Sequence, residues 1–214
     1  MQQKLTDFAK TLGLSLTPSQ YEQLRAYADL VWQKKDQLNL TCVADKNEIL
    51  TRHIADGFAV ASIWNRHFAG QETGTVADMG SGAGYIGITL AIMCPHLRVS
   101  LIESLEKRCA FLNWVVLKLK LSNVDVRHMR LGQETAGFFD LVTERAMGPL
   151  SELLPLLASC VSEKGLVTAY QSQVGRLEEK YLQSHGLQML LPLSYKLPEE
   201  TKERYLMVFK HGYC

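Results

Sequence analysis

Three alternating glycines directly after a short apolar run constrain the fold of this chain more than any other feature. The run Val76-Ala77-Asp78-Met79 leads into Gly80-Ser81-Gly82-Ala83-Gly84, and a helix is predicted to begin near Ile86. Glycines allow a strand to turn sharply into a helix and let the backbone approach a ligand closely, because no Cβ intervenes. In a doubly wound sheet such a loop lies at the carboxyl ends of the strands, where ligands bind.

Short runs rich in β-branched residues alternate with helical stretches after Gly74. Seven of these runs are predicted to be strands: TVADM (75–79), VSLIE (99–103), VDVRH (124–128), FDLVT (139–143), GLVTAY (165–170), LQMLLPL (187–193) and RYLMVFK (204–210). The alternation predicts an α/β fold, with a mostly parallel seven-stranded sheet and helices on both faces. The last two runs have no helical stripe between them, so we expect them to form an antiparallel pair.

The first seventy residues are predicted to form a helical subdomain (1–70) in front of the α/β domain (71–214). Apolar residues with helical spacing end at Gly13, which is a typical stop signal. Thr17 precedes Pro18 and stands three residues before Gln20, which predicts a capping box at the start of a second helix. A third helix is predicted from Asp45 to about Trp64.

Composition excludes several classes of protein. The 214 residues carry a net charge of only +1, so a uniformly basic nucleic-acid-coating protein is excluded and any RNA contact must be local. The five cysteines form no CxxC pair and the histidines no HExxH motif, which argues against a disulfide framework and a metal site. Without a signal peptide or an apolar stretch of bilayer length, we expect a cytoplasmic protein that does not contact membranes.

Two acidic residues bear on which ligand the glycine loop binds. The literal pattern GxGxxG is present at Gly82, Gly84 and Gly87, so a dinucleotide must be considered. However, Asp78 at the end of its strand would repel a pyrophosphate and attract a cationic amino group, such as that of S-adenosylmethionine. Glu103 ends the next strand and could accept hydrogen bonds from ribose hydroxyls in either cofactor. The residues favour the methyl donor over a dinucleotide or a purely structural turn.

Five segments in the same order carry a resemblance to a known family. They are Asn39-Leu40-Thr41, Arg52-His53-Ile54-Ala55-Asp56, Asp78–Gly84, Lys107–Leu112 and Glu144-Arg145-Ala146. With them the chain resembles the ribosomal RNA small subunit methyltransferase G family, also called glucose-inhibited division protein B, from about residue 20 to 210. The resemblance implies a Rossmann-like class I methyltransferase fold. It also implies methylation of N7 of a guanine in bacterial 16S rRNA, with S-adenosylmethionine as donor and the rRNA or small ribosomal subunit as partner.

The resemblance also implies two groups of site residues. The group for the methyl donor comprises Asp78, Gly80, Ser81, Gly82, Gly84, Tyr85, Glu103, Ser104, Arg130, Leu131, Gly132 and Arg145. The group for catalysis and RNA positioning comprises Arg52, His53, Lys107, Arg108 and Arg145. The segment from Arg130 to Glu134 would pass near the adenine, and Tyr85 could stack on the target base or pack against the loop.

The chain departs from the family pattern at several positions. Tyr85-Ile86 stands where Leu-Pro is frequent, Thr89 stands for a proline, Arg130-Leu131-Gly132 for Arg-Ala-Glu, and Gln171-Ser172 for Lys-Gly. Two alternatives stay open: an NAD-dependent oxidoreductase, because of the GxGxxG pattern, and an inactive RNA-binding assembly factor, because of the Gln171-Ser172 departure. Guanine N7 has a free lone pair at neutral pH, so direct transfer needs alignment rather than a general base. We expect the chain to act as a monomer.

Overall fold

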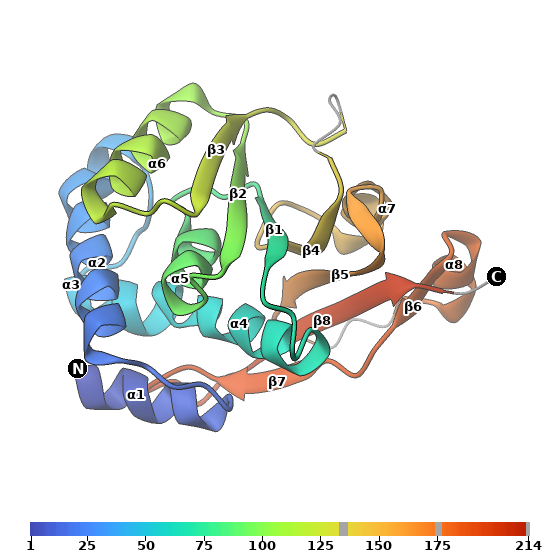
Figure 1. Cartoon of the computed structure of the whole chain (residues 1–214), viewed down its shortest axis with the longest axis horizontal. Helices are drawn as coiled ribbons and strands as arrows, with labels where there is room; N and C mark the ends of the chain where they lie inside the picture. The colour runs from blue at the N-terminus through green and yellow to red at the C-terminus, as the bar shows by residue number, and fades with distance from the viewer. Residues whose placement is uncertain (133–136, 174–176, 213–214) are drawn as a thin grey trace.

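The computed structural model describes residues 1–132, 137–173 and 177–212. Its centre is one twisted sheet in the strand order β3-β2-β1-β4-β5-β8-β6, with β7 also paired to β8 (Figure 1). The strands are β1 (Gly74–Met79), β2 (Leu97–Glu103), β3 (Val124–His128), β4 (Phe139–Glu144), β5 (Val161–Gln171), β6 (Leu187–Met189), β7 (Leu193–Lys196) and β8 (Glu203–His211). Strands β1 to β5 pair in parallel, whereas β8 runs antiparallel to β5, β6 and β7.

The sheet has eight strands where seven were predicted, because the apolar run 187–193 is interrupted. Leu187 pairs with His211 and Leu193 pairs with Leu206, so the register along β8 shifts by one residue between β6 and β7. Pro192, which cannot donate a hydrogen bond, and the 90% exposed Leu191 lie at this interruption. The predicted closing antiparallel pair is confirmed, in two pieces along one edge of β8.

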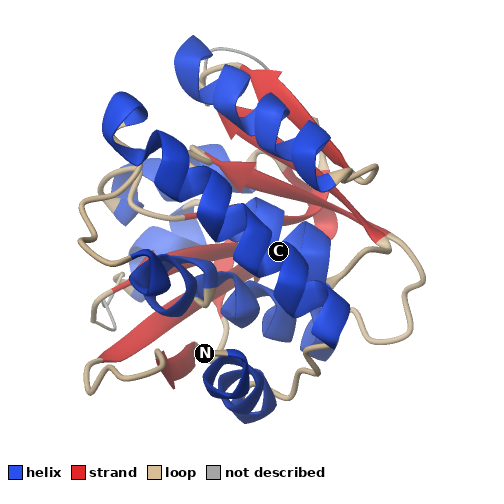
Figure 2. Ribbon diagram, turned by 90° about the vertical axis from the view of Figure 1, so that its left-hand side faces the viewer, coloured by secondary structure: helices blue, strands red, loops and turns tan. Residues whose placement is uncertain are grey.

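Alternate residues of the strands divide between two hydrophobic cores, one on each face of the sheet. Val76 and Leu101 belong to the larger core, whereas their neighbours Ala77 and Ile102 belong to the smaller one. The larger core is covered by α1 (Gln2–Thr11), α2 (Pro18–Leu38), α4 (Asp56–His67), α5 (Tyr85–Met93) and α6 (Glu106–Leu119). The smaller core is covered by α7 (Leu150–Ala158) and α8 (Glu179–Ser184). Figure 2 shows helices stacked in front of the twisted sheet. Helices on both faces are therefore confirmed.

The N-terminal helices form largely where the sequence predicts them. The capping box of α2 is present, since the Thr17 hydroxyl accepts from Gln20 N–H and the Gln20 side chain accepts from Thr17 N–H. The predicted third helix is a succession of α3 (Lys46–Glu48), a π-helical turn η1 (Ile49–Ile54) and α4. Because a π turn contains more residues than an α turn, it changes which side chains share a face around Arg52 to Asp56. Among the described helices, none is long and apolar enough to span a bilayer.

Candidate functional site

The glycine loop closes tightly between β1 and α5. Gly80, Gly82 and Gly84 have φ of +63°, +60° and +85°, a region that favours glycine. A Cβ on Gly80 would lie 2.6 Å from Met147, and one on Gly84 would lie 2.7 Å from Leu112. The sequence interpretation of this segment as a strand, a sharp turn and a helix is confirmed, with α5 beginning one residue before Ile86.

Asp78 lies at the end of β1 with its carboxylate at the N-terminus of α5. Its side chain is buried and accepts a hydrogen bond from Gly87 N–H at 2.9 Å. Burial raises the pKa of Asp78 to about 7, which the hydrogen bond from Gly87 and the charge of Arg145 only partly oppose. Because a carboxylate already occupies this helix N-terminus, a pyrophosphate there would meet an uncompensated like charge.

Glu103 ends β2 and is held against the same loop. Its two carboxylate oxygens accept from Gly82 N–H at 2.8 Å and from Leu105 N–H at 2.9 Å. Arg108 approaches this carboxylate at 4.0 Å from α6. The oxygen bonded to Leu105 also accepts from the Ser104 hydroxyl at 3.5 Å, and the oxygen bonded to Gly82 keeps a further lone pair for a hydroxyl donor beside the loop.

Two cavities adjoin the glycine loop and meet at Gly80. The first, which we call the Asp78 cavity, has a volume of about 200 Å³ and is lined by Leu40, Asp78, Gly80, Ser81, Gly82, Ala83, Tyr85, Ile86, Arg108, Arg145 and Ala146. The second, the Met147 cavity, has about 160 Å³ and is lined by Gly80, Ile102, Ser104, Met129, Arg130, Leu131, Met147, Leu153 and Leu156. Gly132 lies beside Leu156, whereas Gln133 and Glu134 lie outside the described residues. The structure thus gathers the predicted donor residues around one loop.

Arg145 lies at the boundary of the Asp78 cavity, directly after β4. One guanidinium nitrogen is 2.8 Å from the Asp56 carboxylate, and the guanidinium lies 5.1 Å from the centre of the Tyr85 ring. The next residue, Ala146, has φ of +62°, which is unusual for a residue with a Cβ. This strained turn directs Arg145 back toward the N-terminal helices instead of along the strand.

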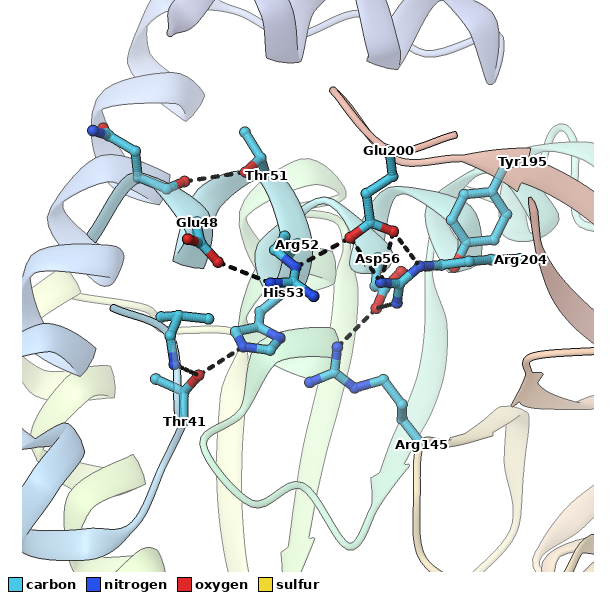
Figure 3. A network of polar contacts seen from close by, with 12 residues as sticks. Thr41, Glu48, Thr51, Arg52, His53, Asp56, Arg145, Tyr195, Glu200 and Arg204 are labelled. Atoms are coloured by element: carbon cyan, nitrogen blue, oxygen red, sulfur yellow. Dashed lines mark hydrogen bonds and ion pairs between the residues drawn. The ribbon is translucent and has the colours of Figure 1, made fainter. Parts of the chain in front are cut away.

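Asp56 organises a buried polar cluster that sequence reasoning missed. It is fully buried at the start of α4, and its carboxylate also accepts from the Arg204 guanidinium at 3.1 Å and from the Tyr195 hydroxyl at 2.8 Å. Figure 3 shows Arg145 and Arg204 converging on Asp56 from different elements. The Tyr170 hydroxyl donates to the Asp56 backbone carbonyl at 2.7 Å. The RHxxD pattern contains Asp56, but no local signal connects it to strands near the other end of the chain.

His53 and Tyr85 form a stack next to Arg145. The His53 ring lies 4.5 Å from the Tyr85 ring, and its Nε2 is 2.8 Å from the Thr41 hydroxyl. Burial, followed by the nearby cations Arg145, Arg52 and Arg204, lowers the pKa of His53 to about 4. His53 is therefore neutral at physiological pH. Tyr85 contacts both His53 and Arg145 and is only 4% exposed, which favours packing against the loop over stacking on a base.

The remaining predicted cations are placed differently. Arg52 is half-exposed and pairs with Glu48 and Glu200 rather than with Asp56 four residues later. Lys107 lies exposed on α6, one residue before Arg108. Arg108 and Arg145 therefore line the Asp78 cavity, whereas Arg52 and Lys107 do not.

Glu144 is a second buried acid that the sequence interpretation did not single out. It ends β4 opposite Met79 on β1, and its carboxylate accepts from Met147 N–H at 3.3 Å. Burial raises the pKa of Glu144 to about 7, with a further contribution from the charge of Asp78. Across the described ranges, no group of three or more His, Cys, Asp or Glu side chains is arranged to hold a metal ion.

The sequence is similar to those of a known protein family. The model of the family described as rRNA small subunit methyltransferase G matches residues 20–198. The chain is 30% identical to the protein named ribosomal RNA small subunit methyltransferase G from Lysinibacillus sphaericus, over 97% of this chain and 90% of that protein. It is 31% identical to the protein of the same name from Bacillus subtilis, over 92% of this chain and 85% of that protein.

Solved structures share the fold at low sequence identity. Magnesium protoporphyrin IX methyltransferase from Synechocystis, with bound S-adenosylmethionine, superposes with a TM-score of 0.64 at 14% identity, covering 89% of this chain and 97% of that one. Ribosomal protein L11 methylase from Lactobacillus delbrueckii superposes with a TM-score of 0.55 at 17% identity, covering 74% of this chain and 80% of that one. The predicted Rossmann-like class I methyltransferase fold is confirmed.

Proposed function

The chain belongs to the rRNA small subunit methyltransferase G family, and we propose that it transfers a methyl group from S-adenosylmethionine to N7 of a guanine in bacterial 16S rRNA. The observation that carries the proposal is the buried Asp78 carboxylate, which occupies the N-terminus of α5 at the floor of the glycine loop. This arrangement favours an ammonium group over a phosphate. It therefore supports the methyl donor and argues against a dinucleotide.

Each part of the donor has chemically suitable neighbours. Asp78 would pair with its ammonium group, and Glu103 would accept hydrogen bonds from its ribose hydroxyls beside Gly82. The mainly apolar Met147 cavity, which Arg130 and Leu131 reach, would take the adenine. When bound, the sulfonium supplies an activated methyl group.

The acceptor chemistry requires orientation more than proton transfer. Guanine N7 would bond to the methyl carbon with its own lone pair while the carbon–sulfur bond of the sulfonium breaks, so that a neutral thioether leaves and the product base carries the positive charge. The buried acid Asp78 lines the cavity and would lie near that charge, and Arg145 at the boundary of the cavity would position the nucleotide. His53, whose pKa is about 4, supports Arg145 through the Tyr85 stack rather than by contributing a charge.

Methyl transfer and cofactor binding, measured separately, test this proposal. Radiolabelled S-adenosylmethionine is incubated with unmethylated 16S rRNA or small subunits, and the product is digested for nucleoside analysis. We expect 7-methylguanosine with the wild-type chain. Asp78→Ala should abolish cofactor binding in calorimetry, whereas Arg145→Ala should retain it and lose transfer. Unchanged cofactor affinity in Asp78→Ala would refute the role of Asp78.

Two alternatives are separated by the same measurements. Heat release with NAD and none with S-adenosylmethionine would establish an oxidoreductase. Binding of rRNA without any methyl transfer would establish an assembly factor. The Asp78 carboxyl at the N-terminus of α5 supports the methyl donor over NAD, whereas Glu103 suits either cofactor.

A further inference from the structure

A third cavity lies beside the site, on the opposite side of Arg145 from the glycine loop. It has a volume of about 290 Å³, and we call it the Tyr170 cavity after the residue at the end of β5 that lines it. Arg145 and Ala146 line both this cavity and the Asp78 cavity. The two cavities are therefore neighbours at Arg145 and Ala146.

The wall of the Tyr170 cavity is rigidly fixed at its base. Asp56 is fully buried and holds Arg145, Arg204 and the Tyr195 hydroxyl, while the Tyr170 hydroxyl donates to the Asp56 carbonyl. Side chains held in this way lose little further freedom when a ligand binds. The cavity is therefore a preformed site rather than a surface depression.

Three cations line this cavity, and they are not equally available. Arg204 donates to Asp56 and forms a two-nitrogen contact with Glu200, so its charge is largely compensated. Arg145 uses one terminal nitrogen on Asp56. Lys202 lines the same cavity, is exposed, and has no hydrogen-bond or ion-pair partner within the described ranges. The positive charge that is free to bind an anionic ligand in this cavity is therefore that of Lys202, together with the remaining N–H groups of Arg145.

We propose that the Tyr170 cavity receives the target nucleotide and that Lys202 binds its backbone phosphate. This inference rests on the proposed function, because it assigns the acceptor side of the same site. The amide of Gln171 and the hydroxyl of Ser172 line the cavity and can form hydrogen bonds with a base or ribose. The shared boundary at Arg145 then places the base next to the methyl group, as direct transfer requires.

Substitutions that remove or keep the positive charge test the role of Lys202. Lys202→Gln removes the cation, and Lys202→Arg keeps a positive charge at the same place in the cavity. Lys164→Gln is the matched control, because Lys164 is an exposed lysine near the start of β5, at the opposite end of the strand from Gln171. All variants are compared with the wild-type chain on the RNA or small subunit that the wild type methylates.

We expect Lys202→Gln to raise KM for RNA about fivefold, since an exposed ion pair contributes modestly, and to leave kcat and cofactor affinity unchanged. The slope of log affinity against log salt should fall by about 0.7, the value for one phosphate contact to a single strand. Lys202→Arg, which keeps the positive charge, should keep the KM and the salt slope of the wild type. Lys164→Gln should behave as the wild type.

The proposal is overturned if Lys202→Gln keeps the wild-type KM and salt slope, or if Lys164→Gln loses as much. A rise in KM for Lys202→Arg as large as that for Lys202→Gln would also overturn it, provided that thermal melting and cofactor binding are those of the wild type. The wild-type chain itself reports on the proposed function. If it transfers methyl groups and the Lys202 variant is indistinguishable from it, the cavity assignment fails alone; if it transfers none, the function fails.

Discussion

Replacement of Asp78 by asparagine should stabilise the fold while it weakens cofactor binding. Burial raises the pKa of Asp78 to about 7 from an ordinary value of 3.8. Between about pH 5.5 and pH 7 the folded chain therefore retains a proton that the unfolded chain has released, and stability falls as pH rises. When one extra proton is bound by the folded chain over about 1.5 pH units, the free energy of unfolding falls by about 2 kcal/mol across that interval. The decrease is complete above pH 7. The amide introduced by Asp78→Asn cannot ionise, so the free energy of unfolding of this variant should not fall in this way as the pH rises.

Urea denaturation without cofactor at about pH 5.5 and pH 8 measures this effect. The stability of Asp78→Asn relative to the wild type should increase by about 2 kcal/mol between the two pH values. Glu144 is present in both proteins, so its contribution largely cancels. Asp36→Asn, at a side chain that is 85% exposed, is the control and should show no such change. In calorimetry at pH 8, Asp78→Asn should bind S-adenosylmethionine far more weakly. A constant stability difference at both pH values would refute the reasoning.

Three further substitutions probe neighbouring parts of the site. Glu144→Gln should gain stability relative to the wild type between about pH 5.5 and pH 8, because burial raises the pKa of Glu144 to about 7, and parallel urea titrations would detect it. Gly84→Ala should lower the free energy of unfolding by about 2 kcal/mol in thermal or urea melts, since φ is +85° and the new Cβ would lie 2.7 Å from Leu112; an unchanged melt would contradict this. Asp56→Asn should cost about 3 kcal/mol because Arg145 loses its buried counterion, and methyl transfer should fall more than cofactor binding; equal losses of both would indicate a purely structural role.

The fold was largely predictable from the sequence because its signals are local. The capping box at Thr17 and the alternation of Val76 with Ala77 depend on residues within a few positions of one another. The interruption of the run 187–193 was not predicted, since Leu191 and Pro192 are consistent with either a strand end or a bulge until β8 is in place. The π turn in η1 was likewise missed, because apolar spacing does not distinguish it from an α turn.

The same distinction between local signals and long-range contacts applies to the residues of the site. Asp78 and the glycines of its loop were identified because a strand, a turn and a helix follow one another directly in sequence. The contacts of Asp56 were not, because its partners Arg204 and Tyr195 come from strands near the other end of the chain. Their approach depends on the antiparallel pairing of β7 with β8 beside α4, which is a property of the whole sheet.

The charges around Arg145 explain why one site suits both a sulfonium donor and a base that becomes cationic. Asp56, Asp78 and Glu144 come from α4, β1 and β4, and all three side chains are buried. Burial raises the pKa of all three carboxyls, and Arg145 forms an ion pair with Asp56, whereas Asp78 and Glu144 have no ion-pair partner among the described residues. An arriving cation supplies the missing compensation, and a diphosphate would increase the imbalance. The same two acids that lower stability at neutral pH thereby favour binding of the positively charged methyl donor.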